Sequence, residues 1–124
     1  MRSDVTSSSV RGHLVLHFSG ELDVAARDVF RGARELLERS RGSRSVLDLS
    51  EVSFLDCAGV HDLDSLVRDF SPEPVVVCPP GGPGRILELT QLTDVHTVVP
   101  TLLHAVSPRF QESPRARRAP DQTG

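Results

Sequence analysis

Hydrophobic and polar residues alternate in the stretch HLVLHFSG near the N-terminus. The residues on one face are Leu14, Leu16 and Phe18, and those on the other are His13, Val15 and His17. A period of two predicts a strand over about 13–19. An earlier edge strand over about 7–11 also fits the pattern.

Two helical patterns follow, separated by a second strand. Behind Asp23, a residue type that caps helices, apolar residues recur at Ala26, Val29, Phe30, Ala33, Leu36 and Leu37. Gly42 is a suitable stop for this first helix. A strand over 45–49 then leads into SFLDCAGV, and helical spacing returns at Val60, Leu63, Leu66, Val67 and Phe70. The second helix begins at Asp56 or Cys57.

The rest of the chain continues the alternation of strands and helices. The segment 74–78, PVVVC, is apolar on both faces, as in a central strand, and PPGGPG predicts a loop over 79–84. A short helix is expected at Ile86, Leu87, Leu89 and Leu92, a last strand at 96–99, and a final helical segment from Pro100 or Thr101. This order predicts an α/β domain whose sheet is mostly parallel, with the first strands antiparallel at its edge.

The length of 124 residues fits one domain. From Ser107 onward the chain has three prolines, scattered charge and one large apolar residue. We therefore expect a folded domain over 1–106 and a disordered tail over 107–124.

Composition argues against nucleic-acid and membrane partners. Residues 1–108 hold ten arginines against fifteen acidic residues, and the only aromatic residues are five Phe. An acidic body repels phosphate backbones, and few aromatic rings are available to stack on bases. No apolar run approaches the roughly 18 residues of a membrane span, and no signal peptide is recognisable. With only two cysteines, the expected location is the cytoplasm.

The residues do not predict an enzyme, a metal site or a cofactor. No HExxH or CxxC motif occurs, and His13 and His17 on a strand lie about 13 Å apart, too far to share an ion. Cys57 follows Asp56, which disfavours a thiolate, so a structural role is favoured over a nucleophilic one. No GxSxG motif is present and no catalytic dyad can be assembled from local sequence. The GGPG loop lacks the pattern of a phosphate-binding loop.

Three motifs in order resemble the STAS domain of bacterial anti-sigma-factor antagonists, over about residues 10–106. They are LHFSGELDVA, VLDLSEVSFLDCAGV and RILELTQLTDVHTVVPTLLHAV. The resemblance implies a mixed, mostly parallel sheet of about four to five strands packed with about four helices. It also implies a protein that acts by binding: the family docks an Asp-Ser-Ser-Gly helix start onto an anti-sigma factor with a kinase-like ATPase fold, and so frees a sigma factor. The partner kinase ends binding by phosphorylating the second serine.

Carried onto this chain, the resemblance implies a partner-binding surface at one turn and one helix start. Its residues are Asp23, Asp56, Cys57, Ala58, Gly59 and Val60. Cys57 replaces the first serine of the motif and Ala58 the phosphorylated one, so the usual switch is missing; Ser50 and Ser53 are out of register with it. Gln91 stands for a glycine of the late motif.

The expected function is therefore antagonism of an anti-sigma factor without the serine switch. The alternative is a diverged STAS scaffold or small-ligand sensor module in a signalling complex, which the loss of the phosphosite favours.

Overall fold

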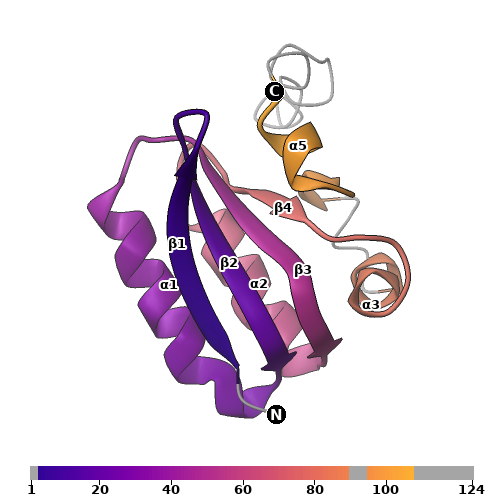
Figure 1. The fold of residues 1–124 in the computed structure, drawn as a ribbon. Helices are drawn as coiled ribbons and strands as arrows, with labels where there is room; N and C mark the ends of the chain where they lie inside the picture. Colours follow the sequence, from indigo (N-terminus) through magenta and orange to yellow (C-terminus); the bar gives the residue numbers. More distant parts are fainter. Residues whose placement is uncertain (1–2, 90–94, 108–124) are drawn as a thin grey trace.

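The computed structural model describes residues 3–89 and 95–107 (Figure 1). The elements are β1 (Asp4–Val10), β2 (His13–Leu22), the 3-10 turn η1 (Val24–Ala26), α1 (Arg27–Arg39), β3 (Ser45–Leu55), α2 (Cys57–Arg68), β4 (Val75–Val77), α3 (Pro83–Leu89), β5 (Val98–Val99) and α5 (Leu102–Ala105). No helix among these described residues is long and apolar enough to cross a bilayer.

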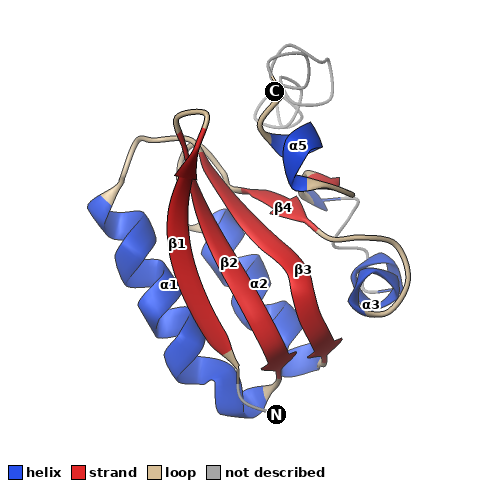
Figure 2. Cartoon of the chain, viewed as in Figure 1, coloured by secondary structure: helices blue, strands red, loops and turns tan. Residues whose placement is uncertain are grey.

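The five strands form one mixed sheet in the order β1-β2-β3-β4-β5. The pair β1–β2 is antiparallel, and each following pair is parallel. Helical connections link the parallel strands, as crossover geometry requires (Figure 2). The predicted α/β class, mostly parallel sheet and antiparallel edge are confirmed.

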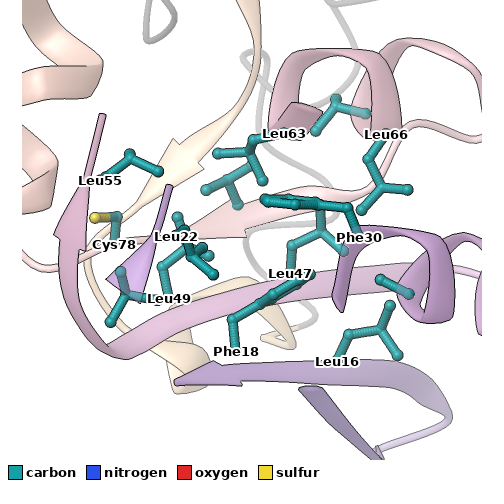
Figure 3. Close-up of a cluster of buried hydrophobic side chains, with 14 of the residues drawn as sticks. Leu16, Phe18, Leu22, Phe30, Leu47, Leu49, Leu55, Leu63, Leu66 and Cys78 are labelled. Carbon is teal, nitrogen blue, oxygen red and sulfur yellow. The ribbon is translucent and has the colours of Figure 1, made fainter. Parts of the chain in front are cut away.

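One face of the sheet carries the main core, beneath α1 and α2. Leu16 and Phe18 of β2 pack there with Phe30 of α1 and Leu63 and Leu66 of α2 (Figure 3). The rings of Phe18 and Phe30 lie 5.6 Å apart between centroids. These apolar residues are those that the strand and helix periodicities place on buried faces.

The opposite face of the sheet is covered in part by α5. Val15, Val46 and Val77 form a second apolar cluster with Ala105 and Val106. Alternate residues of β2 therefore enter two different clusters, which explains why Val15 is buried although it lies opposite Leu16 and Phe18.

Several element boundaries differ from those that the sequence predicts. The strands predicted at 13–19 and 45–49 extend to Leu22 and Leu55, and two register shifts between β2 and β3 accommodate the extra length of β3. The predicted loop over 79–84 ends earlier, because Pro83 begins α3. The predictions for Gln91 and Leu92, and for the tail beyond Ser107, lie outside the described residues.

A buried histidine ties the region before β5 to α2. The His96 side chain is 2% exposed, and its Nε2 donates to Oδ1 of Asp64 at 2.6 Å. Its Nδ1 lies 3.4 Å from Oε1 of Glu73. Burial alone would raise the pKa of the Asp64 carboxyl, but hydrogen bonds and charge from His96 and Arg68 outweigh it and lower the pKa below its usual 3.8.

The lowered pKa of Asp64 predicts an acid-sensitive share of stability. The unfolded chain binds a proton at Asp64 more readily than the folded one, so this share is present above pH 3.8 and is lost as pH falls through the folded pKa. Urea unfolding from neutral pH downward should show the difference in unfolding free energy between wild type and Asp64→Asn shrinking below about pH 4. A difference that stays constant with pH would contradict this assignment.

Candidate functional site

The ends of two neighbouring strands each lead directly into a capped helical turn. After β2, Oδ1 of Asp23 accepts a hydrogen bond from the Ala25 amide at 2.9 Å, at the start of η1. After β3, Oδ1 of Asp56 accepts one from the Gly59 amide at 2.9 Å, at the start of α2. Each carboxylate satisfies an amide that the helical turn leaves unpaired. We call residues 22–24 and 54–59 the capped corner.

The two halves of the capped corner are joined through the backbone of Leu22. The Asp56 amide donates to the Leu22 carbonyl oxygen at 3.4 Å. A Cβ on Gly59 would overlap that same oxygen and would lie 2.7 Å from Cδ1 of Leu55. Only glycine at position 59 lets α2 begin this close to the end of β2.

The surface of the capped corner is apolar at its prominent positions. Val24 is 63% exposed and Phe54 is 48% exposed. Cys57 is exposed with a free thiol, and Ala58 is half-buried beside it. These residues lie in segments that the pairing of β2 with β3 brings together, and exposed apolar side chains that gather in one place are typical of a protein interaction surface.

The six residues predicted as partner-binding lie in or next to this corner, but not all of them face outward. Asp23 and Asp56 are half-buried caps, and Gly59 and Val60 are buried. Val60 packs in the main core with Leu63 and supports the corner from beneath. Cys57 is exposed and Ala58 is half-buried, and neither side chain caps the helix. These two members of the predicted set are therefore accessible to a partner.

Two exposed residues of the corner, Val24 and Phe54, were missed by the sequence prediction. Phe54 is exposed because a register shift separates the Gly20–Val52 pair from the Glu21–Phe54 pair, which breaks the alternation of β3. Ser53 and Phe54 are consecutive and both exposed, and the buried Leu55 follows them. The sequence alone does not reveal this break in alternation, because it depends on how β3 pairs with β2.

The chemistry of the described residues does not include a metal cluster: no group of three or more His, Cys, Asp or Glu side chains within 3–89 and 95–107 could hold an ion. The second cysteine, Cys78, is buried, and burial followed by the nearby charge of Asp48 raises the pKa of its thiol to about 11. Cys78 is therefore protonated at neutral pH and unreactive.

Comparisons with known proteins agree with this architecture. A family model described as STAS domain matches residues 5–105, so the chain belongs to the STAS domain family. A solved structure from Mycobacterium paratuberculosis, an anti-sigma factor antagonist, superposes with a TM-score of 0.77 at 25% sequence identity. The match covers 85% of this chain and 92% of that one. No curated protein sequence matches the chain.

The Asp56 cap is expected to contribute to folding stability. Asp56→Ala removes the acceptor of the Gly59 amide and should lower the free energy of unfolding by about 1 kcal/mol. Asp56→Asn keeps a capping oxygen and should unfold close to wild type in urea. Equal losses in both variants would show that the cap is not the source of the stability.

The close approach of Gly59 to the Leu22 carbonyl predicts a larger loss of stability when Gly59 is substituted. Gly59→Ala forces a methyl into the Leu22 carbonyl and should cost about 1–3 kcal/mol of unfolding free energy, measured by denaturant titration. Gly32→Ala in α1 is the matched control, since its Cβ would meet Val5 Cγ1 at an ordinary 3.9 Å. That variant should be neutral or stabilising. A tolerated Gly59→Ala would contradict the observed packing.

Proposed function

We propose that this protein is an anti-sigma factor antagonist whose capped corner binds an anti-sigma factor with a kinase-like ATPase fold, which then releases its sigma factor. The observation that carries the proposal is a capped, apolar helix start in a STAS domain, with Asp56 and Gly59 of the family motif retained. The similarity to an anti-sigma factor antagonist supports the same role. We place this activity in the cytoplasm, in the domain formed by residues 1–106.

The shape of the corner supports docking of a protein partner. Val24 follows the end of β2 and Phe54 lies near the end of β3, and both are exposed, while Val60 in the first turn of α2 is buried. Apolar side chains that protrude from a rigid support lose little conformational freedom on binding. We therefore assign the direct contacts to Val24, Phe54, Cys57 and Ala58, and a supporting role to Asp23, Asp56, Gly59 and Val60.

The lack of a phosphorylatable side chain at position 58 supports a complex that phosphorylation does not dissociate. Ala58 offers a methyl where the family motif has the phosphorylated serine, and Cys57 precedes it. A phosphate there would add a charge of about −1.5 to −2 at a close-packed contact. Because Ala58 cannot accept one, binding would be constitutive or set by the abundance of the antagonist.

Substitution at position 58 tests this role. Ala58→Glu places a carboxylate in the contact and should weaken binding to a purified kinase-fold anti-sigma factor from the same genome by at least about tenfold, measured by calorimetry. Leu103→Glu, at a 65% exposed position on α5, is the control and should bind as wild type. Equal binding by all three proteins would contradict docking at the capped corner.

The same complex tests the absence of the switch. With ATP, the anti-sigma factor should leave the wild-type chain unmodified over 53–60, and Ala58→Ser should become phosphorylated and dissociate. Phosphate on the wild-type segment with release of the partner would overturn constitutive binding. Failure to bind any kinase-fold anti-sigma factor, with recovery of sensor proteins instead, would favour the scaffold or sensor alternative.

A further inference from the structure

Three polar side chains from neighbouring strands form a hydrogen-bonded line across the sheet, away from the capped corner. Oγ of Ser8 in β1 lies 2.8 Å from Nε2 of His17 in β2. Nδ1 of the same ring lies 3.0 Å from Oδ2 of Asp48 in β3. The order serine, imidazole, carboxylate, with one ring nitrogen facing each neighbour, is the arrangement of a serine nucleophile, its base and the group that orients the base.

The donors and acceptors in this line fix the tautomer of the neutral His17 ring. A carboxylate only accepts, so Nδ1 must carry the hydrogen that is donated to Asp48. In the neutral ring Nε2 is then an acceptor, and the Ser8 hydroxyl donates to it. The proton of Ser8 therefore already points at a base.

Asp48 is held in place by the strand on which it lies. Its other oxygen, Oδ1, accepts from the Ser50 amide at 3.0 Å and from the Ser50 hydroxyl at 2.6 Å. The side chain is 11% exposed, compared with 34% for His17. A carboxylate that is both buried and held by Ser50 has little freedom to turn away from the ring, so Asp48 is a positioning residue for His17.

Ser8 is distinguished from the serines beside it by the face that it occupies. Ser7, Ser8 and Ser9 are consecutive and all exposed, but alternation along β1 places Ser8 on the face of His17 and the other two on the opposite face. Ser8 therefore combines solvent access with a base at hydrogen-bond distance.

We propose that Ser8 is an activated nucleophile that accepts an acyl group from small activated esters. Ser8 Oγ attacks the ester carbonyl, and its proton passes to His17 Nε2. The new Oγ–acyl bond forms as the bond to the leaving alkoxide or phenoxide breaks, and the proton is then given up to the leaving group or to water. Ser8 is exposed on the edge strand β1, so small, reactive acyl donors can reach it without a deep pocket.

The composition of the chain makes this chemistry easy to detect. All fourteen basic residues are arginine, so no lysine amine competes for an acyl group. Trypsin cleavage after Arg2 and Arg11 would release residues 3–11, which contain Ser8, and cleavage after Arg44 and Arg68 would place the exposed thiol of Cys57 in a different peptide.

The experiment is acetylation of the full chain by p-nitrophenyl acetate at neutral pH, followed by peptide mass spectrometry. Fragmentation of the 3–11 peptide should place the acetyl group on Ser8 at least about tenfold above Ser7 or Ser9. Ser8→Ala should abolish the label in this peptide, whereas Ser9→Ala should leave it unchanged. His17→Gln, which keeps a side-chain amide able to donate to Asp48, should slow labelling of Ser8 by about a hundredfold.

Two controls separate activation from simple exposure. The unfolding midpoint of each variant shows that it is folded, and labelling of the wild type in concentrated guanidinium should remove the preference for Ser8. Comparable acetylation of the three serines in the folded protein would overturn the proposal. So would preferential labelling of Ser8 that persists at the same rate in folded His17→Gln.

Discussion

The contact between the backbone of Gly59 and the carbonyl oxygen of Leu22 is the constraint on which the candidate site depends. Without a side chain at position 59, α2 starts directly against the end of β2, and the Asp56 amide reaches the same carbonyl. The turn after β2 and the helix after β3 therefore present one continuous surface. Leu55, buried between them, joins that surface to the main core, so the helix start cannot move without disturbing packing.

The two proposed activities use opposite properties of the same strand. At its carboxyl end, β3 delivers Phe54 and the helix start to an apolar surface that suits a protein partner. Near its middle, Asp48 lies on the face opposite the main core and organises a polar line toward β1. Partner binding and acyl transfer can therefore be altered separately by substitution, because neither needs the side chains of the other.

The sequence predicts the elements well where the hydrophobic periodicity is regular. It predicts them poorly where pairing between strands determines their length and register. The alternation of β2 and the helical spacing of α1 and α2 are local, and the structure confirms all three. The length of β3 was missed because SEVSFL does not alternate, and its register shifts arise only from pairing with β2. The contact between His17 and Asp48 joins residues 31 positions apart and likewise requires the register. The caps, by contrast, are local, so Asp23 and Asp56 could be recognised from the sequence, although Asp23 caps the 3-10 turn η1 and not α1, which begins at Arg27.

We propose that a protein partner contacts the capped corner. Amide hydrogen exchange of this chain, alone and bound to a kinase-fold anti-sigma factor, measures the contact surface directly. Docking at the capped corner predicts slower exchange on binding at η1 and in the first turn of α2, with β1 and α5 unchanged. Slower exchange confined to β1 or α5, with the corner exchanging as in the free protein, would contradict it.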